Sequence, residues 1–228
     1  MPVSEYLRRN FNDVIENVTD LFGFVEYTPL YGGRQFVNPQ LSNVDINWMY
    51  DNNIGLKLPL SNHYVTKEDY DASAAILRKY HRKGNSITLV NDAAVEWFRE
   101  DYPLYSIEAS VIKDFKTVDA VDEALARYDV VVLHGSWNTD EERLAALMYK
   151  DRIRLFANMG CVLNCPSKIC YPSFSKLNKK IVGATPLCSQ PYIAREVKMT
   201  TFDVVNLESM GFTKFKLLLA NERGLTGY

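Results

Sequence analysis

The sequence predicts an α/β protein whose fold is a small (β/α)8 barrel of the TIM type, formed by one domain over residues 1–228. Three observations support this prediction. The chain has 228 residues, a length that suits one large domain. Eight short β-type runs alternate with helical patterns, and this alternation indicates a parallel sheet. No internal repeat or Pro/Gly-rich linker divides the chain.

The predicted strands are short runs of β-forming and apolar residues. Eight such strands, each followed by a helix, would close a barrel, although little sequence follows the last run for a final helix. In chain order the strands are expected at residues 23–28, 54–60, 86–91, 105–110, 129–135, 152–158, 180–187 and 214–220.

Helical patterns lie between these strands. Residues 4–20 form an amphipathic pattern, and this N-terminal helix is a candidate to cover the place of the missing last helix. Thr66 is a predicted N-cap for the helix after the second strand, and Gly84 is its predicted end. Further helices are expected over 118–128 and after a Thr139 cap.

Composition indicates an ordinary globular protein, with 47% hydrophobic and 24% charged residues. A formal charge of -2 leaves no global attraction to nucleic acid, so RNA contact would need a local patch such as the run SKLNKK at 175–180. No apolar run approaches the roughly 18 residues of a membrane span, and the first residues do not resemble a signal peptide. We therefore expect a cytoplasmic protein.

Polar side chains occur at the ends of successive predicted strands, where barrel enzymes build their active sites. Proton transfer is assigned to His63, Glu108 and His134. Arg34 is expected to clamp an anion, because its guanidinium offers forked donors to a carboxylate or phosphate. The alternative is that strand ends become polar wherever a chain leaves its core. The remaining expected substrate-binding residues are Asn62, Asn91, Ser110 and Asn158.

Three of the four cysteines lie in an expected loop over 159–179, and the fourth ends the predicted seventh strand. Spacings of three, four and seventeen residues are irregular for zinc but suit a [4Fe-4S] cluster, since four thiolates form a complete ligand set. Zinc, and cysteines that bind no metal, are the alternatives. The four expected ligands are Cys161, Cys165, Cys170 and Cys188.

Four segments give the chain a resemblance to the collagenase-like peptidases, a U-type family that includes iron-sulfur hydroxylation factors for RNA and for ubiquinone. These segments are YGGRQF at 31–36, DYPLYSIEASVI at 101–112, RIRLFANMGCVLNC at 152–165 and LESMGFTKFKLLLA at 207–220. The resemblance implies cluster ligation by Cys161, Cys170 and Cys188, with Cys165 the fourth ligand by proximity. In the last segment Lys216 matches the family pattern, whereas Leu218 and Ala220 replace its acidic residue and arginine.

Three functions follow as hypotheses. The first is an iron-sulfur barrel enzyme that hydroxylates RNA or a small aromatic substrate and uses an electron donor or partner subunit. The second is a peptidase, as the family name asserts, with Ser110 at a strand end; the sequence has neither a GxSxG nor an HExxH motif to support it. The third is a non-catalytic binding or scaffold protein whose metal only fastens the cysteine loop.

Overall fold

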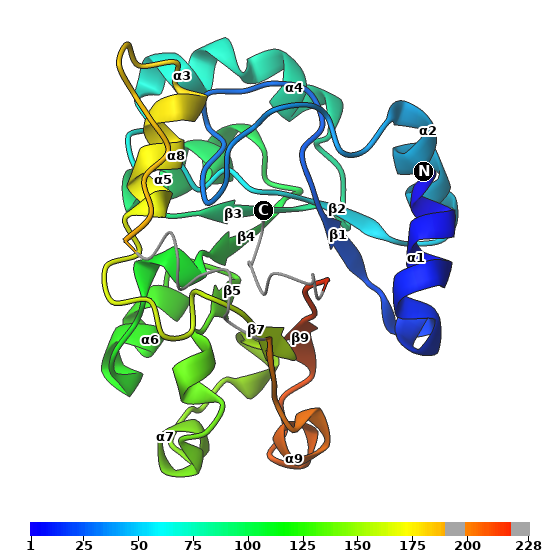
Figure 1. Ribbon diagram of the computed structural model, residues 1–228, viewed down its shortest axis with the longest axis vertical. Coiled ribbons are helices and arrows are strands. Elements are labelled where there is room, and N and C mark those ends of the chain that lie inside the picture. The colour runs from blue at the N-terminus through cyan, green and yellow to red at the C-terminus, as the bar shows by residue number, and fades with distance from the viewer. Residues whose placement is uncertain (190–198, 220–228) are drawn as a thin grey trace.

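The computed structural model describes residues 1–189 and 199–219. A seven-stranded, all-parallel sheet forms its centre and curls into an open half-barrel (Figure 1). The first and last strands in the sheet order are its edges. In that order the strands are β1 (Asp20–Phe22), β2 (Gly55–Leu58), β3 (Ser86–Leu89), β4 (Ser106–Ala109), β5 (Val130–Val132), β6 (Ile153–Phe156) and β9 (Lys214–Lys216).

The predicted closed barrel of eight strands is wrong. The sheet has seven strands in the described residues, and β1 does not pair with β9. Residues 180–187, the expected seventh strand, form turns in which Ile181 N–H donates to Lys176 O and Ala184 N–H donates to Ile181 O. Gly183 has a φ of +77°, and Val182 is 99% exposed. This run is apolar, but nothing in the described structure covers it, so it does not become a strand.

The first strand lies earlier in the chain than expected. β1 ends at Phe22, and Gly23 N–H makes the last backbone bond to β2, at 3.3 Å from Lys57 O. Phe24 and Val25 are buried, but they belong to the loop that follows. The apolar run at 23–28 predicts a strand, and the prediction is wrong because a buried loop and a buried strand share the same local pattern.

Helices cover the outer face of the sheet and connect successive strands (Figure 1). Thr66 is the N-cap that the sequence predicts, with its hydroxyl accepting from Asp69 N–H in a capping box. The expected single helix after it is two helices that meet at Ser73. The connecting helices are α2 (Asn43–Asp51), α3 (Lys67–Ala72), α4 (Ala74–Lys79), α5 (Asp92–Asp101), α6 (Val118–Leu125), α7 (Glu141–Ala145), α8 (Cys170–Asn178) and α9 (Val204–Ser209).

The N-terminal segment is a helix, α1 (Val3–Phe11), followed by a 3-10 turn over Asn12–Asn17. Val3 N–H donates to Asp45 Oδ1 at 2.7 Å, so α1 lies beside α2 and flanks the β1 edge. The expected helix over 4–20 therefore ends earlier, and its last residue, Asp20, opens β1. A separate antiparallel pair joins β7 (Asn158–Met159) to β8 (Thr200–Thr201).

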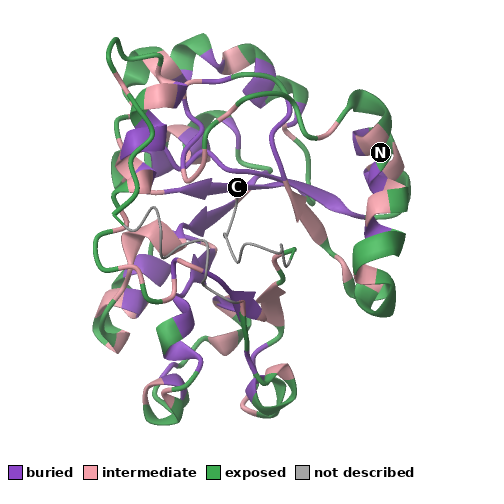
Figure 2. Cartoon of the chain, in the orientation of Figure 1, coloured by how far each residue is buried: buried purple, intermediate pink, exposed green. Residues whose placement is uncertain are grey.

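The core lies between the sheet and its helices, and the strands are largely buried (Figure 2). Leu56, Ile107, Val131 and Leu155 are each fully buried at the middle of a strand. Each such side chain contributes about 1.5–3 kcal/mol by leaving water. Residues that alternate with them point to the concave side, because side chains alternate between the faces of a strand. Within the described residues, no helix is long and apolar enough to span a membrane.

Candidate functional site: a charged cavity at the carboxyl edge of the sheet

Four charged residues meet inside the half-barrel. Lys57 Nζ lies 2.9 Å from Asp20 Oδ1 and 2.9 Å from Glu108 Oε1. An Arg154 Nη atom lies 3.0 Å from Asp20 Oδ2 and 2.8 Å from the same Glu108 oxygen. These residues come from β1, β2, β4 and β6, so the network joins distant strands of the sheet. We call this set the interior ion network.

Burial alone would raise the pKa of Asp20, but the charges of Lys57 and Arg154, with hydrogen bonds from both, outweigh it and hold that pKa at about 2. Burial likewise would lower the pKa of Arg154, whereas Glu108 and Asp20 raise it on balance. Within the described structure, Glu108 Oε2 and Arg154 Nε are buried without a hydrogen-bond partner. Such atoms are costly to leave unpaired, so they are candidates for contact with a ligand or water.

A cavity of about 120 Å³ lies next to this network, at the carboxyl ends of the strands. This volume is well above the ~10–15 Å³ that one water molecule requires, so the cavity has room for a small organic molecule. Glu108 and Ser110 line it from β4 and the residue that follows β4, and Arg34 and Lys216 line it from the two edges of the sheet. Of these four residues, Glu108, Ser110 and Arg34 are site residues predicted from the sequence.

Lys216 ends the edge strand β9 and reaches across the opening of the sheet toward β1. Its Nζ lies 4.1 Å from the centroid of the Phe22 ring and 5.6 Å from that of Phe156. Burial lowers the pKa of Lys216, the charge of Lys57 lowers it further, and Glu108 opposes them only in part, so that this pKa is about 7.

Arg34 is held beside the cavity by a close approach of backbone segments. A Cβ at Gly32 would lie 2.1 Å from Ser61 O, and Gly33 has a φ of +79°, so both positions require glycine. The guanidinium packs 4.7 Å from the Phe24 ring centroid, and an Nη atom donates to Gln40 Oε1 at 2.6 Å. Burial lowers the pKa of Arg34 to about 10.

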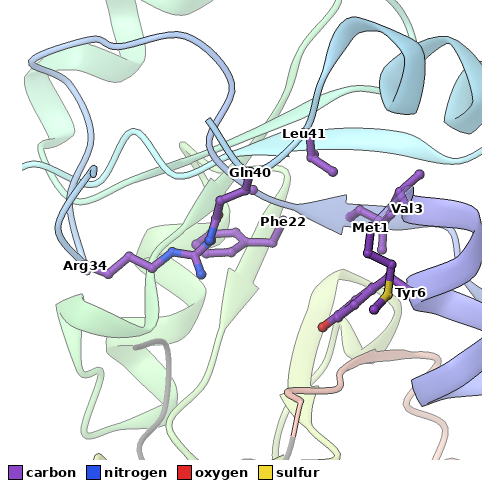
Figure 3. A pocket seen from close by; sticks show the side chains of 9 residues that line it. Met1, Val3, Tyr6, Phe22, Arg34, Gln40 and Leu41 are labelled. Atoms are coloured by element: carbon purple, nitrogen blue, oxygen red, sulfur yellow. The ribbon is translucent and has the colours of Figure 1, made fainter. Parts of the chain in front are cut away.

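The same arginine also borders a second hollow, of about 260 Å³, between β1 and α1. Figure 3 shows Arg34 beside Gln40 and Phe22, with Tyr6 and Met1 on the other side of the hollow. Arg34 Nε is buried without a hydrogen-bond partner in the described structure. The guanidinium therefore retains a donor for a ligand.

Asn62 and His63 do not line the cavity; both contact helix α8. Asn62 Nδ2 donates to Pro29 O, Tyr31 O and Ser175 O at 2.9–3.1 Å. His63 Nδ1 lies 3.1 Å from Ser175 Oγ, and burial lowers the pKa of this histidine. In this structure both residues attach α8 to the loops that follow β1 and β2.

The other predicted residues are spread over the carboxyl edge. His134 is buried between Ser136 Oγ and Val162 O, and burial lowers its pKa. Asn91 caps α5 through Ala93 N–H. Asn158 pairs with the backbone of Leu218 through both its amide atoms, at 2.9 and 2.8 Å. Each has a bonding role within the fold.

The cysteines lie along the segment that leads from β6 into α8 and beyond. The expected loop over 159–179 includes α8, and Cys170 is the first residue of that helix. Burial raises the pKa of Tyr171, and the charges of Cys170, Cys161 and Cys165 raise it further, so those three thiols lie near enough to act on its hydroxyl. Cys165 Sγ lies 3.5 Å from Ser189 Oγ, the residue after Cys188. No group of three or more His, Cys, Asp or Glu side chains is arranged to hold a metal in the described residues.

Sequence reasoning missed Asp20, Lys57, Arg154 and the role of Lys216. Their signal was a charged residue inside an apolar strand pattern, as in IGLKLPL and RIRLFAN. A charge at such a position is rarely buried unless it is paired. Charges of opposite sign inside the apolar patterns of different strands therefore predict buried ion pairs. Only the fold shows which of these side chains contact one another.

Comparison with known proteins supports the fold. No family model and no curated protein matches the sequence. A solved structure described as "The Structure of the U32 Peptidase Mk0906" superposes with a TM-score of 0.63. The match covers 93% of this chain and 89% of that chain at 13% sequence identity. At this identity the likeness concerns the fold, and it supports the resemblance to the U32 collagenase-like family at that level.

Proposed function

We propose that the protein binds a small carboxylate in the charged cavity and that this cavity is the site of its activity. One observation carries the proposal: cationic groups outnumber carboxylates around the cavity. Among the described residues, Lys57 and Arg154 pair with Asp20 and Glu108, so Arg34 leaves one positive charge in excess even when Lys216 is neutral. Buried unpaired charge is costly, and a bound anion would neutralise it.

Oxalate tests this proposal, because it is a small dicarboxylate. It has no aldehyde group that could react with a lysine amine, so it reports binding alone. We expect calorimetric titration to detect oxalate binding and Arg34→Gln to weaken it about tenfold or more, since a charge-assisted hydrogen bond contributes roughly 1.5–3 kcal/mol. Arg99→Gln is the matched control, because Arg99 pairs with Asp129 on the outer surface. Absence of binding, or equal binding by the wild type and Arg34→Gln, would refute the proposal.

We further propose that Cys161, Cys165, Cys170 and Cys188 bind an iron-sulfur cluster of the [4Fe-4S] type, with zinc as the alternative. Cysteine thiolates are the usual ligands of such clusters, and the four cysteines provide the number that a [4Fe-4S] cluster requires. Their arrangement in the structure does not fit a cluster, because the described residues contain no group of three or more His, Cys, Asp or Glu side chains that could hold a metal ion. Thiolate ligands require a reducing compartment, so the proposal includes a cytoplasmic location.

Cys165 is the ligand with the best support from its surroundings. Burial raises the pKa of its thiol, but hydrogen bonds from Ser189 and backbone N–H groups and the charge of Lys168 outweigh this and lower it. Anaerobic purification should yield about four irons and four sulfides per chain, and Cys165→Ala should lose most of both. Ser167→Ala in the same turn is the control. A metal-free wild type would contradict the proposal, and one zinc per chain would support the alternative.

For a protein that holds an iron-sulfur cluster, the proposed activity is hydroxylation of RNA or a small aromatic molecule. The reaction would use an electron donor or partner subunit. Its support is the sequence resemblance together with the likeness in fold. Peptidase activity has weaker support. The hydroxyl of Ser110 accepts from Ile112 N–H and has no histidine partner in the described residues, and Ser175, the serine beside His63, is fully buried. A protein that binds metal but no carboxylate would instead be a scaffold with a metal-fastened segment.

A further inference from the structure

Two lysines reach the interior of the half-barrel, and their surroundings differ. Lys57 Nζ contacts carboxylates of Asp20 and Glu108 at 2.9 Å each. Lys216 forms no ion pair within the described residues, and aromatic rings flank it instead. The first lysine therefore belongs to the interior ion network. The second presents its amine to the cavity without an acidic partner.

Charged groups on several elements act on the amine of Lys216. Burial lowers its pKa, as do Lys57 on β2, Arg34 in the loop after β1 and Arg154 on β6, whereas Glu108 on β4 raises it. The resulting pKa of about 7 leaves roughly half of the amine uncharged at neutral pH. An uncharged amine in a desolvated site is a nucleophile toward carbonyl carbon.

We propose that Lys216 forms an imine with a small 2-oxo acid bound in the cavity. This inference rests on the proposed carboxylate-binding function, because Arg34 supplies the donor for the carboxylate and Lys216 lines the same cavity. The cavity volume of about 120 Å³ limits the substrate to a small molecule.

The reaction balances without an oxidant or reductant. The lone pair of Lys216 Nζ forms a bond to the carbonyl carbon, and the π bond of the carbonyl breaks to give an alkoxide. Transfer of a proton from nitrogen to oxygen gives the carbinolamine. Loss of the hydroxyl with one further proton as water forms the carbon–nitrogen double bond. Glu108, whose Oε2 lacks a hydrogen-bond partner within the described residues, lines the cavity as a proton carrier.

Glyoxylate with cyanoborohydride tests the inference, because reduction of the imine leaves a carboxymethyl group on the amine that reacted. Peptide mass mapping should place this group on Lys216 first. The initial rate should be roughly tenfold higher one pH unit above 7 than one unit below it, following the uncharged fraction of an amine with this pKa. Excess oxalate should slow the labelling by occupying the carboxylate site.

Two variants separate the possible outcomes. Lys216→Arg keeps a cation but loses the nucleophile, so it should abolish labelling at this position while oxalate still binds. Lys214→Arg is the matched control, because Lys214 is on the same strand but donates to Asp151 O on the surface, and its loss should leave labelling of Lys216 unchanged. Oxalate binding without labelling of Lys216 overturns the imine and leaves the proposed function standing. Labelling no faster than at surface lysines also overturns it, and absence of oxalate binding overturns the proposed function itself.

Discussion

At the scale of single residues, the interior ion network shows how paired charge is accommodated within a small sheet. Lys57 and Glu108 are 3% and 2% exposed, and each has an oppositely charged partner. Removing one member of such a network leaves the others buried without compensation, which costs more than the net stabilisation that the pair provides. Asp20 matters for pH dependence, because the charges of Lys57 and Arg154 hold its folded-state pKa at about 2.

Asp20 should make the free energy of unfolding fall in acid. Its pKa is about 2 in the folded state against 3.8 as the ordinary value, so its stabilisation is present above pH 4 and is lost as the pH falls toward 2. The contribution is roughly 2 kcal/mol. Urea unfolding across this range should give a shallower pH dependence for Asp20→Asn than for the wild type. Asp51→Asn, at an exposed position of α2, should keep the wild-type slope.

At the scale of elements, side chains attach α8 to the loops that follow β1 and β2. Asn178 Nδ2 donates to Tyr31 O and Arg34 O, and its Oδ1 accepts from Phe36 N–H. Asn62 holds the same helix through Ser175 O. The loop that carries Arg34 and the helix that begins at Cys170 are therefore connected. Movement of α8 would reach both the carboxylate site and the cysteine segment.

Asn62→Ala should release α8. Asn62 is fully buried, and its loss leaves three carbonyl groups without that donor, so we expect a destabilisation of about 3 kcal/mol. Hydrogen exchange should accelerate in the amides of Cys170–Asn178. Asn91→Ala removes a helix cap and should cost only about 1 kcal/mol, without faster exchange in α8. Unchanged exchange in α8 of Asn62→Ala would show that the other contacts of α8 suffice.

At the scale of the whole molecule, no described strand pairs β1 with β9, and side chains bridge the opening between these two edges. Arg154 on β6 reaches Asp20 on β1, and Lys216 on β9 packs on Phe22 of β1. In a closed barrel, backbone hydrogen bonds would occupy this place. The opening therefore places Lys216 and Arg34 at the rim of one cavity, and a barrel completed by an eighth strand would separate these two edges.

Local patterns in the sequence predict the alternation of strands and helices, the Thr66 cap, and the carboxyl edge as the place of Arg34, Glu108 and Ser110. These features depend on local periodicity, capping and strand direction. Tertiary structure decided that residues 180–187 are not a strand. It also decided that, across residues 1–189 and 199–219, the sheet stays open and Lys57 forms ion pairs while Lys216 forms none. Those outcomes depend on contacts between residues far apart in the chain. A local pattern specifies which residues are buried, but not which partners they meet there.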